Sequence, residues 1–92
     1  GRHREILRKF DSQAAGIIEN LQAACKTRDA SAVQFQSHKL KSSAGTVGAR
    51  RVSQLSQALE AAGKEQDWAQ VTALFAQISA ELKRVSDHIN GR

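Results

Sequence analysis

The clearest helical pattern lies in residues 68–90, whose sequence is WAQVTALFAQISAELKRVSDHIN. Its apolar side chains recur at alternating intervals of three and four residues, at Trp68, Val71, Phe75, Ile78, Leu82, Val85 and Ile89. This interval places them on one side of an α-helix, which is then buried against other parts of the chain. Asp67 precedes the segment and is a preferred N-cap residue. We therefore expect a helix over residues 68–90 that begins at the Asp67 cap.

Three earlier segments show the same period, and we expect helices over residues 3–28, 30–47 and 49–62. The apolar stripe of the first segment consists of Leu7, Phe10, Ala14, Ile17, Leu21 and Ala24. The second stripe consists of Val33, Leu40, Ala44 and Val47, and the third of Val52, Leu55, Leu59 and Ala62. Four amphipathic helices with short loops are typical of an antiparallel up-and-down bundle. The expected fold class is all-α, with residues 1–92 forming one four-helix bundle.

One aspartate and three glycines are expected to shape the helix ends and contacts. Asp29 is a natural N-cap for the second helix. Gly48 and Gly63 supply the backbone freedom that ends a helix, so we expect them to terminate the second and third helices. Gly16 lies inside the first helix, where glycine costs about 1 kcal/mol relative to alanine. This cost predicts a close packing contact at Gly16.

The composition favours helices and excludes several other classes of protein. The 92 residues contain no proline and no tyrosine, and aromatic residues make up 4%, which disfavours a β-sandwich or barrel. The single cysteine, Cys25, cannot form an internal disulfide and continues an apolar stripe, so we interpret it as a core residue. No apolar run approaches the length of about 20 residues that crosses a bilayer. We expect a cytoplasmic domain without direct membrane contact. Because the chain begins at Gly1 and lacks methionine, we also expect it to be excised from a larger protein, which could itself be membrane-anchored.

The formal net charge of +5 at pH 7 would suit an acidic protein surface, a nucleic acid or an anionic membrane. The basic residues are spread along the chain without a long block of like charge. The aromatic residues are expected on the apolar stripes rather than among the basic residues, at Phe10, Phe35, Trp68 and Phe75. This arrangement offers no stacking platform for single-stranded nucleic acid, so nucleic acid is not the expected partner.

His38 is a polar residue that the packing of a helical bundle does not require at its position. At 100° per residue, it lies about 140° from the apolar stripe of the second helix and so faces solvent. Its flank also carries Gln34, Lys41, Ser42 and Gly45, because residues three, four and seven apart share a helix face. Glycine inside a helix is unfavourable unless something must approach closely, which marks Gly45 as a contact position.

Glu60 is the expected neighbour of His38 on the third helix. His38 lies ten residues before Gly48 and Glu60 twelve after it, so an antiparallel hairpin places them at nearly the same height. A carboxylate there would accept a hydrogen bond from Nδ1–H of His38 and leave the lone pair of Nε2 outward, as a nucleophile requires. The spacing leaves open that Glu60 is only a solvated surface carboxylate.

Residues 37–49, SHKLKSSAGTVGA, closely resemble the signature of histidine-containing phosphotransfer (HPt) domains. The matching features are the histidine, a leucine two residues on, a lysine three on, a hydroxyl pair and a glycine ten on. The family's carboxylate or amide partner on the following helix falls on Glu60. Ser42 departs from the pattern, because the family usually has glycine there, and its hydroxymethyl group reduces the clearance beside His38.

The resemblance implies a phosphocarrier, which is not an enzyme by itself, within a two-component phosphorelay. His38 would accept a phosphoryl group from a receiver-domain aspartate and pass it to another receiver, with Lys41 neutralising phosphoryl charge and Glu60 orienting His38. Docking or steering of the receiver is expected from Gln34, Lys39, Ser42, Gly45, Arg50 and Arg51. The bundle is expected to be monomeric. It is also expected to need no cofactor or metal of its own, because the response-regulator receiver would supply magnesium. The resemblance implies a hybrid sensor histidine kinase as the parent protein, with a free-standing phosphotransfer protein as the alternative.

Other chemistries of histidine fit these residues less well. The phosphoacceptor helix of dimeric kinases resembles a histidine followed by an acidic residue and then proline, whereas Lys39 follows His38 and the chain has no proline. A metal site would need further ligands, and His3 and His88 lie near the chain ends without Cys, Asp or Glu at ligand spacing. The alternative that the residues leave open is a non-catalytic helical adaptor, which would bind a protein partner without phosphorylation.

Overall fold

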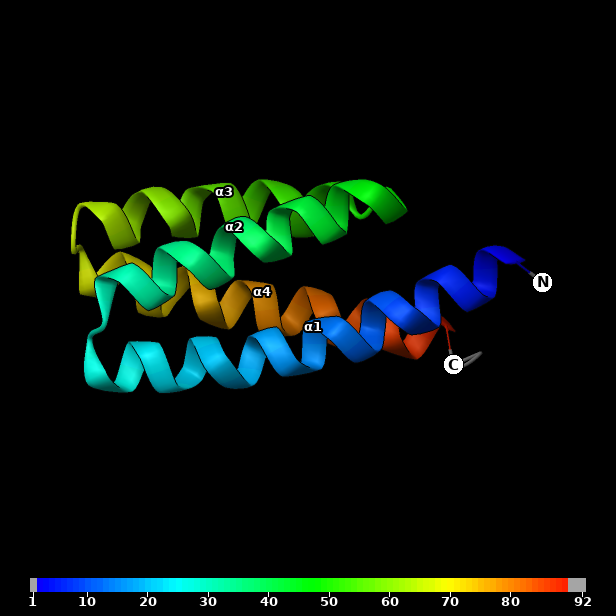
Figure 1. Ribbon diagram of the computed structural model, residues 1–92, viewed down its shortest axis with the longest axis horizontal. Helices are drawn as coiled ribbons and strands as arrows, with labels where there is room; N and C mark the ends of the chain where they lie inside the picture. The colour runs from blue at the N-terminus through cyan, green and yellow to red at the C-terminus, as the bar shows by residue number, and fades with distance from the viewer. Residues whose placement is uncertain (1, 90–92) are drawn as a thin grey trace.

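The structure, a computed structural model, describes the backbone of residues 2–89 and the side chains of residues 5–87. It contains four α-helices: α1 (Arg2–Thr27), α2 (Ala30–Val47), α3 (Arg50–Lys64) and α4 (Trp68–Ile89). Consecutive helices run in opposite directions, so α1 begins and α4 ends at the same end of the molecule (Figure 1). α1 and α3 each pack against both α2 and α4. The predicted antiparallel up-and-down four-helix bundle is confirmed.

Caps at three helix ends agree with the sequence. At the start of α2, the side chain of Asp29 accepts the backbone N–H of Ala32 at 3.1 Å. At the start of α4, Asp67 accepts the N–H of Gln70 at 3.2 Å. Gly48 ends α2 with a left-handed φ of 76°, a conformation that favours glycine. Residues 47 to 50 can therefore reverse the chain tightly, which brings α3 back alongside α2.

The first and third helices differ slightly from the predicted ranges. α1 ends at Thr27 because Arg28 adopts a left-handed φ of 53°, which breaks the helix one residue early. α3 begins at Arg50, and Ala49 takes the N-cap position. For the fourth helix, predicted to run to residue 90, that last residue lies outside the described part of the chain.

Gly63 lies inside α3, and the prediction that it ends this helix is wrong. The helix continues to Lys64, and the left-handed residue that follows is Gln66, with a φ of 57°. Gly63 is buried, and a Cβ atom built on it would lie only 2.7 Å from Cγ1 of Val33 in α2. Glycine at this position therefore allows α2 and α3 to approach closely at the end of the hairpin that lies opposite the Gly48 turn.

The close contact predicted at Gly16 is also wrong. Gly16 is exposed on α1, and the described structure places no side chain and no other helix within 4 Å of a Cβ built there. The glycine therefore has no packing role among the described residues. Alanine would fit at this position without displacing a neighbour.

The core is formed by the predicted stripes of all four helices. Its buried apolar residues are Phe10, Ala14, Ile17, Leu21, Ala24, Val33, Leu40, Ala44, Val52, Leu55, Leu59, Ala62, Val71, Leu74, Ile78 and Leu82. Ser37 and Ser56 are buried with them, and the hydroxyl of Ser56 donates to the carbonyl of Val52 at 2.7 Å. Cys25 packs half-buried against this core, and burial raises the pKa of its thiol, which disfavours the reactive thiolate.

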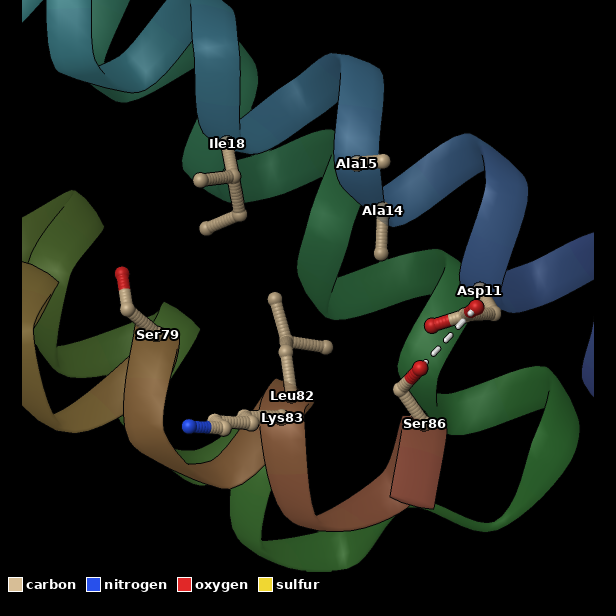
Figure 2. Close-up of a pocket in the computed structure, with 8 residues that line it drawn as sticks. All are labelled: Asp11, Ala14, Ala15, Ile18, Ser79, Leu82, Lys83 and Ser86. Carbon is tan, nitrogen blue, oxygen red and sulfur yellow. Dashed lines mark hydrogen bonds between the residues drawn. The ribbon is translucent and has the colours of Figure 1, made fainter. Parts of the chain in front are cut away.

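α1 is the longest helix and extends past the turn that joins α2 and α3 (Figure 1). α1 also contacts α4, and the hydroxyl of Ser86 on α4 donates to Asp11 Oδ2 on α1 at 3.4 Å. Beside this hydrogen bond, α1 and α4 enclose a shallow groove of about 240 Å³ (Figure 2). Ala14, Ile18 and Leu82 supply its apolar lining. The groove and the outer side of the α2–α3 hairpin are thus separate surfaces of the bundle.

Candidate functional site

His38 lies on the solvent side of α2, as its helical angle predicts. Its side chain is 63% exposed, whereas Leu40 and Ala44 on the core side of the same helix are completely buried. The core stripe fixes the rotation of α2 about its axis, because any other rotation would expose those apolar residues. The exposure of His38 is therefore a consequence of the bundle's packing.

Glu60 lies beside His38, on α3. The carboxylate oxygen Oε2 of Glu60 is 3.4 Å from Nδ1 of His38, and the Glu60 side chain is 32% exposed. The same register between the two helices allows the hydroxyl of Ser53 to donate to the carbonyl of Lys41 at 3.4 Å. With Nδ1 facing Glu60, Nε2 is the ring nitrogen that remains for another molecule.

The other predicted site residues surround this pair on the same hairpin. Lys39, Ser42 and Gly45 are exposed, and Lys41 is half-buried. No side chain and no other helix of the described structure lies within 4 Å of a Cβ built on Gly45, so a partner has room there. Gln34 is half-buried and uses its side chain to donate to the carbonyl of Ala30 at 3.2 Å, within its own helix.

The two arginines at the start of α3 lie near the turn rather than beside the imidazole. Arg50 and Arg51 are both exposed. Arg50 lines a hollow of about 320 Å³ together with Gly45 and Gly48. The hollow therefore extends from the glycines that follow His38 in the chain to a cationic side chain of α3.

The hairpin of residues 30–64 carries most of the chain's net positive charge. It contains five basic residues and a single acidic one, Glu60. The five are Lys39, Lys41, Arg50, Arg51 and Lys64. Because the formal charge of the whole chain is +5, the remaining residues are close to balanced. The face that exposes His38 is therefore suited to an acidic partner.

The sequence interpretation missed Phe35. It placed every aromatic residue on an apolar stripe, but the side chain of Phe35 is 64% exposed. The signal was present in the helical angles, because Phe35 is two residues from Val33 and therefore points about 160° away from it. Phe35 lies three residues before His38, on the same outer side of α2.

The described residues offer neither a metal centre nor a membrane span. Within residues 5–87, no three side chains of the His, Cys, Asp and Glu types gather closely enough to hold a metal ion. Each helix in the described range is too short or too polar to cross a bilayer.

Comparison with known proteins agrees with this geometry. A family model described as the Hpt domain matches residues 5–88, which include both His38 and Glu60. Searches of curated proteins and of solved structures gave no match. Hpt domains act in histidine phosphotransfer within phosphorelays, as phosphocarriers that interact with receiver domains and not as catalysts. Because the family model covers nearly all of its 92 residues, this chain belongs to the Hpt domain family.

Proposed function

We propose that His38 is the phosphoacceptor, taking a phosphoryl group from the aspartate of one response-regulator receiver and passing it to the aspartate of a second. The observation that carries this proposal is an exposed imidazole whose Nδ1 lies 3.4 Å from the carboxylate of Glu60. The family match supports the choice among the three histidines, since His3 lies outside residues 5–88 and His88 is the last residue matched.

In the transfer step, the lone pair on Nε2 of the neutral imidazole attacks phosphorus in line with the departing oxygen. The N–P bond forms while the P–O bond breaks, and the receiver's aspartate leaves as a carboxylate with the electron pair. The imidazole becomes cationic and keeps its proton on Nδ1, beside the negative charge of Glu60. Transfer to the second receiver reverses these changes. Rigid positioning supplies much of the acceleration in such reactions.

Charge around His38 favours the phosphorylated state. Lys41 follows His38 by one turn of α2, which places its ammonium group within reach of phosphoryl oxygens. Opposite unit charges about 4 Å apart interact by about 4 kcal/mol at an effective dielectric constant of 20, and solvent lowers this value at an open site. Lys39, Arg50 and Arg51 act at longer range by steering an acidic receiver face towards the hairpin.

The receiver approaches over Ser42 and Gly45, where the side chains on α2 are small. Gln34 lies on the same side of α2, one turn before His38. In this division of work, the receiver supplies the acidic pocket and its magnesium ion, while this chain supplies the nucleophile and a basic docking face. Turnover therefore belongs to the proteins on either side of the carrier.

Incubation with a receiver phosphorylated on its aspartate tests the proposal. The chain should acquire label that is stable in alkali and lost in acid, as phosphohistidine is. Addition of a second, unlabelled receiver should then remove the label from the chain. A chain that binds the phosphorylated receiver but never becomes labelled would be the adaptor described above.

Replacing Glu60 with alanine should change the proton distribution on the His38 ring. Without the carboxylate 3.4 Å from Nδ1, the Nδ1–H tautomer loses its preferred partner, and both neutral tautomers become populated. We expect transfer to slow by about three- to tenfold, because fewer molecules present the lone pair on Nε2. The ¹⁵N chemical shifts of the imidazole report the tautomer ratio directly. Glu65→Ala, which removes an exposed carboxylate beyond the end of α3, is the matched control. Identical ring shifts in Glu60→Ala and wild type would remove Glu60 from the site.

Replacing Lys41 with alanine should slow transfer by about tenfold, the effect of losing about 1.4 kcal/mol of transition-state stabilisation. The free energy of unfolding should change little, because Lys41 is only half-buried and contributes its carbonyl, not its ammonium group, to the contact with Ser53. Rapid-quench kinetics with a phosphorylated receiver measures the rate. Lys26→Ala removes an equal charge from α1, outside the hairpin, and should transfer normally. If both variants transfer at the same rate, Lys41 has no local role.

A further inference from the structure

Phe35 is an aromatic side chain that the bundle does not use. It is 64% exposed, whereas the apolar residues Val33 and Leu40 of the same helix are completely buried. Among the described residues, Ile6 near the start of α1 is the other large apolar side chain with high exposure, at 43%. Phe35 therefore contributes little to the core and presents most of its ring to solvent.

Phe35 belongs to a row of residues that includes the proposed phosphoacceptor. Phe35, His38, Ser42 and Gly45 follow one another at intervals of three, four and three, so they lie along one outer side of α2. The side chains become smaller along this row, from a phenyl ring to an imidazole, a hydroxymethyl group and a hydrogen atom. A partner that packs closely over Ser42 and Gly45 and reaches His38 also comes close to Phe35, which is the next residue of the row.

The distance along the helix supports simultaneous contact. Three residues correspond to a rise of about 4.5 Å, which is shorter than the footprint of any globular partner. A receiver that brings its aspartyl phosphate to Nε2 of His38 must therefore cover or border the ring of Phe35. Aromatic residues near the centre of an interface, surrounded by charged residues at its edge, typically carry a large share of the binding energy.

The charge of the hairpin identifies the chemistry of the partner. Five basic residues and one acidic residue lie within residues 30–64, and a second copy of this chain would bring the same positive charge. Two such faces repel each other, whereas an acidic receiver face is attracted. The partner that fits Phe35 is therefore an acidic protein with an apolar depression beside its phosphorylated aspartate.

We propose that Phe35 is the apolar anchor that docks the receiver beside His38. This inference rests on the proposed function of His38. Phe35 is a docking residue and takes no part in the bond changes at phosphorus. Its contribution should appear in the receiver concentration needed for transfer and not in the rate at saturation.

Two phosphoryl donors separate docking from chemistry. The first is a phosphorylated receiver, which must dock. The second is phosphoramidate, a small donor whose P–N bond breaks with release of ammonia when His38 attacks, and which needs no docking surface. In Phe35→Ala, the receiver concentration for half-maximal transfer should rise by about tenfold, with the saturated rate within about twofold of wild type. Labelling by phosphoramidate should be unchanged.

Two further variants complete the experiment. Phe35→Leu keeps an apolar side chain and should recover most of the lost affinity, and Ile6→Ala should behave as wild type because Ile6 lies on α1. Unchanged half-maximal concentration in Phe35→Ala would overturn the proposal, as would equal slowing with both donors. A dimer that Phe35→Ala dissociates, with transfer unaffected, would assign the residue to self-association instead. Failure of the wild type to be labelled by either donor would refute the role of His38, a different result from all of these.

Discussion

Replacing His38 with glutamine should abolish phosphoryl transfer to this chain. Glutamine keeps a polar side chain on the outer side of α2, but its amide nitrogen has no lone pair available to attack phosphorus. The fold should persist, because the His38 side chain is 63% exposed and substitutions at such surface positions usually change stability by less than about 0.5 kcal/mol. Labelling from a phosphorylated receiver measures transfer, and circular dichroism with thermal unfolding checks the fold.

The chain supplies its own controls for this experiment. His3→Gln and His88→Gln remove the two other imidazoles and should leave labelling at the wild-type level. Label that persists in His38→Gln would contradict the assignment of the phosphoacceptor. Label that disappears in His88→Gln, with the fold intact, would move the site to the end of α4.

Replacing Gly63 with alanine should destabilise the bundle by about 1–3 kcal/mol, which is the usual cost of inserting a methyl group into a packed core. The new Cβ would lie 2.7 Å from Cγ1 of Val33. Val33 is completely buried and β-branched, so its side chain cannot turn away freely. This steric cost outweighs the gain of about 1 kcal/mol from the better helix propensity of alanine. In a domain of this size, each kcal/mol lowers Tm by about 4–8 °C.

Gly16→Ala is the matched control, because the described structure leaves the space around Gly16 open. Propensity then acts alone, and this variant should gain about 0.5–1 kcal/mol. The double variant Val33→Ala/Gly63→Ala should be less unstable than the sum of its single changes, because the smaller residue removes the clash. A rise in Tm for Gly63→Ala, like that expected for Gly16→Ala, would show that α2 and α3 are not in tight contact there.

The tight contact at Gly63 also matters for the site. Gly63 lies one turn after Glu60 on α3, and Val33 lies on α2 before His38. The spacing of the two helices at this point therefore influences the distance of 3.4 Å between Nδ1 of His38 and Oε2 of Glu60. The stability of the hairpin and the geometry of the site depend on the same contact.

The four helices were predictable from the sequence because their burial repeats with the helical period. Asp29 and Asp67 marked two helix starts, since a capping side chain acts on its own neighbouring N–H groups. Gly48 fixed the register of the hairpin, and from it followed the juxtaposition of His38 and Glu60. These features could be predicted because each depends on neighbouring residues or on the number of residues between two positions.

The features that were missed depend on neighbours from another helix. Gly48 and Gly63 are both glycines near expected helix ends, yet only Gly48 ends a helix, whereas Gly63 is buried inside α3 with Val33 of α2 beside it. Phe35 is exposed for a local reason, because its helical angle of about 160° from Val33 turns it away from the core.

The role of His38 is tested by finding which atom carries the phosphoryl group. The chain, labelled with ¹⁵N in its histidine rings, is phosphorylated by a receiver, and the rings are then observed by NMR. We expect phosphorus coupled to Nε2 of His38, with the proton held on Nδ1. Phosphorus on Nδ1, or a phosphorylated protein in which the ring of His38 is unmodified, would contradict it.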